Sequence, residues 1–233
     1  MGNPYFQFKQ FTIRHDQCGM KVGTDGVLLG AWSPLPSTGH GLDIGTGTGL
    51  LALMAAQRAP EMLFTGIDIE AAAVAQARLN VSASPFADRI RLQQCALQDF
   101  DPGRTLFHAI LCNPPYFESS LLPPDPNRTT ARHTCSLPFA QLATSAARLL
   151  HADGYFSVVL PTSTFDSFRR LCFDAGLHLF RRCDVQTTAH KPPKRTLACF
   201  RHECNELPVE HLVLQEGSQR TTAYQQLCAD FYL

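Results

Sequence analysis

The stretch GLDIGTGTGLLALMAAQ, residues 41–57, decides the fold of this chain. It opens with the short run Gly41–Ile44, continues with glycines at alternate positions, and ends with apolar residues one helical turn apart. This pattern predicts a buried strand, a tight loop and a helix in immediate succession. At the carboxyl end of a strand in an open parallel sheet, glycines let backbone amides approach a ligand closely. The stretch therefore predicts a ligand-binding loop formed by Gly45, Gly47 and Gly49.

The spacing of these glycines indicates the kind of ligand. It is GxGxG, not the GxGxxG that places a pyrophosphate at a helix start. A cofactor with a nucleoside and an amino-acid moiety but no phosphate fits the shorter loop. Asp43 can accept from an ammonium group of such a cofactor, and Asp68, 21 residues beyond Gly47, can accept from both ribose hydroxyls. Glu70 is the alternative to Asp68. A glycine turn with a helix-capping acid remains the purely structural interpretation.

Apolar runs alternate with helix-like stretches along most of the chain. This alternation predicts an α/β fold with a parallel sheet covered by helices on both faces. We expect strands at 41–44, 63–69, 90–95, 107–112, 155–160, 177–185 and 195–201, and helices at 50–57, 71–81, 138–151 and 165–175. A break at Asp153-Gly154 is expected to precede the fifth strand. No segment between these elements resembles an interdomain linker, which favours a single domain spanning residues 1–233.

The bulk composition limits the partners of the chain. Lys+Arg and Asp+Glu number 20 each, so a nucleic acid would have to be bound by a local cationic patch. The nine cysteines are odd in number and form no CxxC pair, which predicts reduced thiols in a cytoplasmic protein. The spacing of Cys199, His202, Cys204 and His211 matches no common zinc pattern, so no metal is expected. No apolar run is long enough to span a membrane.

A second loop carries the predicted chemistry. Asn113-Pro114-Pro115-Tyr116 follows the apolar run 107–112. The Asn113 side-chain oxygen and the Pro114 carbonyl can accept both hydrogens of a planar amino or amide group, while the prolines fix φ and remove competing donors. Accepting both hydrogens favours a pyramidal nitrogen whose lone pair can attack an in-line carbon, and the Tyr116 ring can stack on the acceptor. A rigid turn with a core tyrosine is the alternative.

The two loops together resemble those of amino-group methyltransferases that use S-adenosylmethionine. The N-terminal run is more specific. Phe8–Phe11, His15-Asp16 and Met20–Trp32 closely resemble the bacterial tRNA(Val) (adenine-N(6))-methyltransferase family, as do residues 42–45, 49–54, 113–116, 158–161 and 231–233. This resemblance implies a seven-stranded Rossmann-like sheet, mostly parallel, with one antiparallel strand near an edge.

The resemblance also implies an activity and a set of site residues. The activity is methyl transfer from S-adenosylmethionine to the N(6) amino group of the adenosine on the 3′ side of the anticodon in a valine tRNA. Asn113, Pro114 and Tyr116 would be catalytic, and Asn113 would also contact the cofactor. A short N-terminal segment of about residues 1–40 would cover the cofactor, with contacts from Lys21, Thr24 and Asp25. No obligate protein partner is evident.

One position departs from the family pattern. After the third strand such enzymes usually place an Asp that accepts from the cofactor's adenine amino group, and here Ala96 occupies that position. Backbone groups around Ala96 and Leu97 could contact the adenine instead, with Asp99 as a possible substitute.

A flipped adenosine also requires cations for the neighbouring phosphates. The candidates for RNA binding are Arg128, Arg132, His133, Lys191, Lys194 and Arg195, with Arg181 and Arg182 in addition.

Three alternatives remain open. The same Asn-Pro-Pro-Tyr motif occurs in enzymes that methylate protein glutamine, although their N-terminal substrate domain has no room before residue 43. Another RNA or DNA adenine could be the acceptor. A non-catalytic nucleoside-binding or RNA-binding protein is the alternative from another class, and the intact motif with its cofactor acids argues against it.

Overall fold

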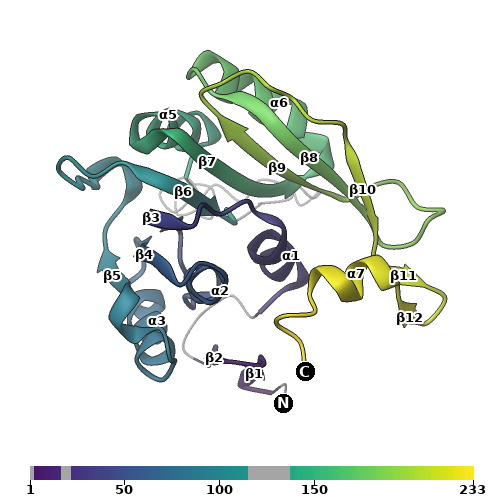
Figure 1. The fold of residues 1–233 in the computed structure, drawn as a ribbon, viewed down its shortest axis with the longest axis horizontal. Coiled ribbons are helices and arrows are strands. Elements are labelled where there is room, and N and C mark those ends of the chain that lie inside the picture. The colour runs from purple at the N-terminus through teal and green to yellow at the C-terminus, as the bar shows by residue number, and fades with distance from the viewer. Residues whose placement is uncertain (1–2, 17–21, 115–136) are drawn as a thin grey trace, which may run out of the picture.

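The computed structural model describes residues 3–16, 22–114 and 137–233. Its centre is an eight-stranded sheet with the order β10-β8-β9-β7-β6-β3-β4-β5 (Figure 1). β9 runs antiparallel to both neighbours, and the other adjacent pairs in this sheet are parallel. The strands are β3 (Thr38–Ile44), β4 (Glu61–Asp68), β5 (Ile90–Gln94), β6 (Phe107–Cys112), β7 (Leu150–Pro161), β8 (His178–Gln186), β9 (Arg195–Arg201) and β10 (Glu210–Val213).

The predicted sheet is confirmed, with two differences. The first is β10, which pairs parallel to β8 and adds an eighth strand at the edge. Its sequence, Glu-His-Leu-Val, is too short and polar to stand out as a strand. The second is β7, which begins at Leu150 and continues through Asp153 and Gly154, where the sequence predicts a break. An irregularity in the pairing with β6, between Phe107 and Ala109, lets the strand continue.

Helices cover both faces of the sheet and divide the core into two clusters (Figure 1). One cluster joins the sheet to the first three helices through residues such as Leu28, Leu53 and Val81. The other joins it to the next two through Leu142 and Phe168. The helices are α1 (Thr24–Trp32), α2 (Leu50–Arg58), α3 (Ala71–Ser82), α5 (Phe139–Leu149) and α6 (Thr162–Asp174), and the 3-10 turns are η1 (Ala87–Arg89) and η2 (Leu97–Asp99).

Helix α1 is not among the helices expected from the sequence, and the family resemblance implies only a covering segment in this region. Two glycines inside the helix disfavour it by propensity. Their role is packing, because a Cβ on Gly30 would lie 2.7 Å from the Met54 sulfur and one on Gly26 would lie 3.0 Å from Leu50. The glycines therefore allow α1 to approach α2 closely, and tertiary contact outweighs propensity.

The two ends of the chain pack against each other (Figure 1). The hairpin of β1 (Tyr5–Gln7) and β2 (Thr12–Arg14) meets the C-terminal residues, since the Lys9 amide donates to the Phe231 carbonyl at 2.8 Å and the Phe8 and Tyr232 rings stack. The hairpin of β11 (Gln215–Glu216) and β12 (Gln219–Arg220) and helix α7 (Thr222–Leu227) lie between β10 and this end.

All cysteines in the part of the chain that the structure describes are free, and burial raises the thiol pKa of Cys183 and Cys199 to about 12. Within the same residues, no group of three or more His, Cys, Asp or Glu side chains could hold a metal ion. Nor is any helix of residues 3–16, 22–114 and 137–233 long and apolar enough to cross a membrane.

Candidate active site

Three parallel strands bring the predicted site residues to the same edge of the sheet. Ile44 at the end of β3 pairs with Ile67 of β4 and with Cys112 of β6. The chain moves outward from β3 to β4 and β5, then returns to β6 on the other side of β3 (Figure 1). Open α/β sheets bind their ligands at such a reversal. The glycine loop, Asp68 and Asn113 therefore all lie where a ligand is expected.

The glycine loop has an open side and a packed side. Gly45 has a φ of 69° and Gly49 a φ of 83°, a region that glycine reaches without steric cost. A Cβ on Gly45 would meet no atom within 4 Å, so the space above this residue is open. A Cβ on Gly49 would lie 3.4 Å from that of Ala77, so this end of the loop rests on α3. The loop is thus supported from below and open toward the ligand side.

Asp68 holds the loop to the end of β4. Its Oδ2 accepts from the Gly47 amide at 2.8 Å, and its Oδ1 accepts from the Glu70 amide at 3.0 Å. Each carboxylate oxygen can accept a further hydrogen bond, and the side chain is only half-buried. Glu70, the alternative ribose acceptor, is exposed and uses its backbone to fix Asp68. The geometry favours Asp68 over Glu70.

Asp43 is completely buried beneath the loop. Its Oδ2 accepts from the Thr46 hydroxyl at 2.6 Å and from the Ala52 amide at 3.2 Å. Its Oδ1 is buried and, among the described residues, has no hydrogen-bond partner. Burial raises the pKa of this carboxyl from 3.8 to about 7, although both hydrogen bonds oppose the rise. One oxygen is therefore fully used by the protein, while the other remains for a donor that the chain itself does not supply.

Asn113 directly follows β6 and lies against the start of α1. A Cβ on Gly26 would be 3.7 Å from the Asn113 side-chain nitrogen. Asn113 is half-buried and Pro114 is buried. The predicted catalytic Tyr116 and the predicted cofactor contact Lys21 lie outside the described residues.

Two residues predicted for different roles form an ion pair. The Arg195 Nε donates to the Asp25 Oδ2 at 2.8 Å, with roughly a quarter of each side chain exposed, 28% and 27%. Asp25 lies in the first turn of α1, next to Thr24, and Arg195 begins β9. The antiparallel β9 starts at the edge where β7 ends, since Arg195 pairs with Pro161. The pair therefore ties the start of α1 to the edge of the sheet that carries Asn113.

Ala96 lies near Asp68, as its predicted role requires. The amide of the preceding Cys95 donates to the Asp68 carbonyl at 2.9 Å. Ala96 is half-buried at the start of η2, where its carbonyl accepts from the Asp99 amide at 3.0 Å. Asp99 is exposed, and its amide stabilises the turn that presents Ala96.

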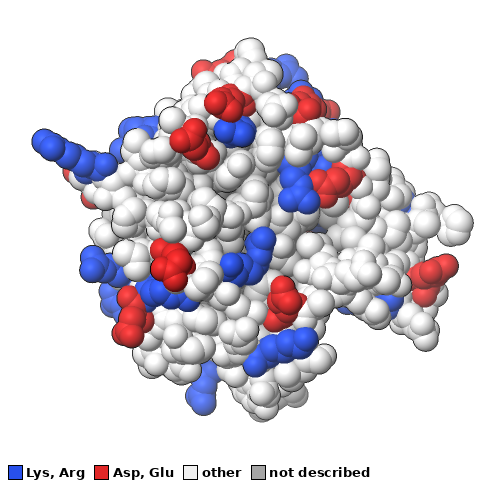
Figure 2. All heavy atoms as spheres, viewed as in Figure 1, with Lys and Arg blue, Asp and Glu red and all other residues white. Residues whose placement is uncertain are grey.

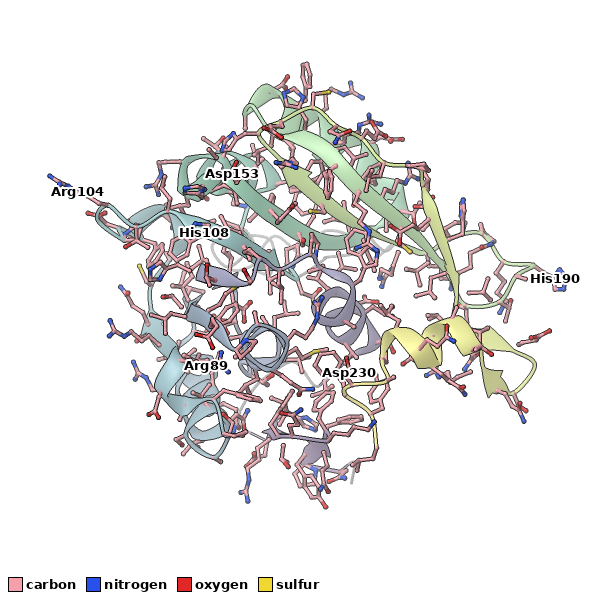
Figure 3. All side chains as sticks on the ribbon, viewed as in Figure 1. Arg89, Arg104, His108, Asp153, His190 and Asp230 are labelled. Atoms are coloured by element: carbon pink, nitrogen blue, oxygen red, sulfur yellow. The ribbon has the colours of Figure 1, made fainter. Side chains whose placement is uncertain are left out.

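The cations proposed for RNA fall into distinct groups. Lys191 and Lys194 are exposed in the connection after β8, and the neighbouring His190 points away from the body of the molecule in Figure 3. Arg181 instead pairs with Glu210 at 3.0 Å and lies over the Trp32 ring, while Arg182 pairs with Asp184 at 2.8 Å. Arg181 thereby joins β8 to β10 and α1, and Arg182, whose ion pair lies within β8, joins that strand to α6 by lying over the Phe165 ring. Arg128, Arg132 and His133 lie outside the described residues.

Figure 2 shows one face of the molecule, on which basic and acidic side chains are interspersed. This mixture agrees with the balanced composition of 20 residues of each sign. The described residues on this face therefore form no continuous patch of basic side chains.

Two polar side chains at the loop were missed by the sequence analysis. Thr46 donates to the buried Asp43, and Asn80 of α3 donates to the Thr48 carbonyl. A threonine between glycines and an asparagine on the buried face of an alanine-rich helix are the signals that could have identified them.

Comparison with known proteins agrees with this geometry. Residues 23–164 match the model of the methyltransferase small domain. A tRNA1(Val) (adenine(37)-N6)-methyltransferase from Phocaeicola vulgatus is 47% identical over 234 residues, covering 100% of this chain and 99% of the relative. One of the same name from Escherichia coli O139:H28 is 40% identical, covering 98% and 94%. The chain belongs to this methyltransferase family.

Solved structures of this methyltransferase's fold are much more distant in sequence. A predicted O-methyltransferase from Agrobacterium tumefaciens matches with a TM-score of 0.69 at 16% identity, covering 89% of this chain and 96% of the other. A SAM-dependent methyltransferase from Corynebacterium glutamicum matches with a TM-score of 0.52 at 17% identity, covering 79% and 90%. These likenesses establish the shared fold alone.

Proposed function

We propose that this protein transfers a methyl group from S-adenosylmethionine to the N(6) amino group of the adenosine 3′ of the anticodon in a valine tRNA. The observation that carries the proposal is that Asn113 and the glycine loop directly follow the paired strand ends Cys112 and Ile44, at the reversal of strand order. The names of relatives that match over the full chain support the substrate. A cytoplasmic location follows from this substrate and is consistent with the free thiols.

The residues at the loop fit S-adenosylmethionine. The cofactor's ammonium group is the donor that the buried Asp43 Oδ1 lacks, the ribose hydroxyls can donate to Asp68, and the open space at Gly45 admits the cofactor without a steric clash. Gly47 contributes its amide to the orientation of Asp68, and Gly49 holds the loop on α3. When bound, S-adenosylmethionine supplies an electrophilic methyl carbon.

Asn113 and Pro114 prepare the acceptor nitrogen. The Asn113 side-chain oxygen and the Pro114 carbonyl accept the two amino hydrogens, which favours a pyramidal nitrogen and directs its lone pair. Rigid placement supplies most of the rate enhancement, because positioned reactants avoid the entropic cost of encounter. We assign stacking on the adenine ring to Tyr116. No base is needed before transfer, since the proton leaves afterwards.

The N-terminal segment of about residues 1–40 completes the cofactor site within a single catalytic domain. Thr24 and Asp25 begin α1 above Asn113, and we assign Lys21 to the same covering segment. Ala96 offers backbone groups to the cofactor's adenine, adjacent to the ribose acceptor Asp68. The hydrogen bond usually made by an acidic side chain at this position is then made by the main chain.

Phosphates near the flipped adenosine are held by local cations. Lys191 and Lys194 are exposed close to the start of β9, whose first residue Arg195 pairs with the covering helix. We include Arg128, Arg132 and His133, which follow the catalytic motif in sequence. Such contacts make binding depend on salt, because each neutralised phosphate releases counterions.

The test is methyl transfer to a mixed substrate pool. The protein is incubated with methyl-labelled S-adenosylmethionine and total RNA from a strain that lacks the enzyme, and labelled nucleosides are mapped. Label in N(6)-methyladenosine beside the valine anticodon supports the proposal. Label at another adenine changes the substrate, label on protein after complete RNase digestion indicates glutamine methylation, and the absence of label with intact RNA binding indicates a non-catalytic protein.

A further inference from the structure

The side chain of Asn80 joins three parts of the molecule that are distant in sequence. Asn80 lies on α3 and is only 2% exposed. Its Oδ1 accepts from the Arg14 amide at 2.9 Å, and its Nδ2 donates to the Arg14 carbonyl at 2.9 Å and to the Thr48 carbonyl at 2.9 Å. One amide group thus satisfies three backbone groups, one in the glycine loop and two at the end of β2.

The surroundings of Asn80 make this contact specific to the loop. Ala77 and Val81, one helical turn away or adjacent on α3, contact the position where a Cβ on Gly49 would lie, at 3.4 and 3.7 Å. Gly49 therefore rests on the side chains of Ala77 and Val81, which cannot form hydrogen bonds. A buried carbonyl without a partner costs free energy, so the Thr48 carbonyl depends on Asn80.

The second partner of Asn80 belongs to the N-terminal hairpin. Arg14 ends β2, which pairs with β1, and the hairpin packs against the C-terminal residues. We propose that Asn80 is a positioning residue that fixes the hairpin of β1 and β2 and the glycine loop relative to each other, so that both are already ordered when the cofactor binds. This inference rests on the proposed use of S-adenosylmethionine, and it assigns a function to a residue that does not touch the cofactor.

The expected effect of losing Asn80 is a change in cofactor affinity without a change in chemistry. In Asn80→Ala, cofactor binding has to order two independent segments. This ordering costs free energy that the pre-ordered wild-type site does not lose. We expect the Kd and KM for S-adenosylmethionine to rise about tenfold or more, while kcat at saturating cofactor and the KM for tRNA stay within about twofold. Asn113 and Pro114 remain in place, which is why turnover persists.

Two further variants separate positioning from general destabilisation. Arg78→Ala removes a hydrogen bond from the same helix to the Leu92 carbonyl, away from the loop, and should leave the cofactor Kd unchanged. Asn80→Asp keeps an acceptor for the Arg14 amide but sets a carboxylate against two carbonyls. Its cofactor Kd should exceed that of Asn80→Ala at neutral pH and improve as the pH falls, because a protonated carboxyl can donate again.

The deciding experiment is calorimetric titration of the wild type and the three variants with S-adenosylmethionine, together with amide hydrogen exchange of the wild type. Cofactor should protect residues 45–49 and 12–14 together in the wild type. An unchanged Kd in folded Asn80→Ala, equal weakening in Arg78→Ala, or protection of the loop without the hairpin would overturn the inference. A wild type that does not bind S-adenosylmethionine would instead refute the proposed function.

Discussion

At the scale of single residues, the proposed contact between Asp43 and the cofactor predicts that binding depends on pH. Burial raises its pKa from 3.8 to about 7, so the folded protein binds more protons than the unfolded chain between these values. The contribution of Asp43 to the free energy of unfolding therefore falls as the pH rises through this window and is constant above it. An ammonium group at Oδ1 favours the ionised carboxyl. We expect cofactor affinity to rise with pH up to about 7 and then level off, with a slope of at most about tenfold per pH unit.

Titration calorimetry across this pH range measures the effect. Asp43→Asn keeps the shape of the side chain and removes its charge, so its cofactor affinity should be weaker and independent of pH. The variant should unfold at a temperature equal to or above that of the wild type near pH 8, about one unit above the raised pKa, because the cost of burying a charge is gone. A pH-independent affinity in the wild type would remove Asp43 from the cofactor site.

At the scale of elements, the Asp25–Arg195 pair makes a prediction about α1. If Arg195 acts by holding the helix, Asp25→Asn and Arg195→Gln should each weaken cofactor binding, and the double variant should be no worse than either one. The coupling energy between two such partly exposed charges is expected at about 1 kcal/mol. A double-mutant cycle measures this coupling energy from the cofactor Kd values of the wild type, both single variants and the double variant. Additive losses, or a raised KM for tRNA in Arg195→Gln alone, would indicate that Arg195 contacts RNA instead.

Elements differ in how far the sequence predicts them. Residues 41–57 carry a clear strand, loop and helix pattern, and β3 and α2 follow it closely. Helix α1 could not be predicted, because its propensity is low and Gly26 and Gly30 are explained only by the facing side chains Leu50 and Met54. Strand β10 could not be predicted either, because its pairing with β8 is set by tertiary contact. Arg181 looks like a surface cation in sequence, because its partner Glu210 lies on β10 and comes near only in the folded sheet, whereas the partner of Arg182 is Asp184 on the same strand.

At the scale of the whole molecule, a neutral protein must bind RNA through a local surface. Charge reversal by Lys191→Glu with Lys194→Glu should raise the KM for tRNA about tenfold or more and flatten its salt dependence, with cofactor Kd unchanged. Arg91→Glu with Arg104→Glu is the matched control, since it changes the net charge equally, both residues are exposed, and Arg104 lies at the opposite side of the molecule in Figure 3. Steady-state kinetics at several salt concentrations give the comparison. Equal effects of the reversal at both places would mean that only net charge matters.

The catalytic assignment to Asn113 is the central claim, and one pair of measurements on Asn113→Ala tests it most directly. Cofactor affinity is measured by calorimetry, and the single-turnover rate of N(6)-methyladenosine formation is measured in valine tRNA. Asn205→Ala, at an exposed asparagine, serves as the control. The account predicts a cofactor Kd within about threefold of the wild type and a rate lower by roughly two to three orders of magnitude, as for one oriented polar contact in a closed site. An unchanged rate, or a rate that falls only in proportion to lost cofactor binding, would contradict it.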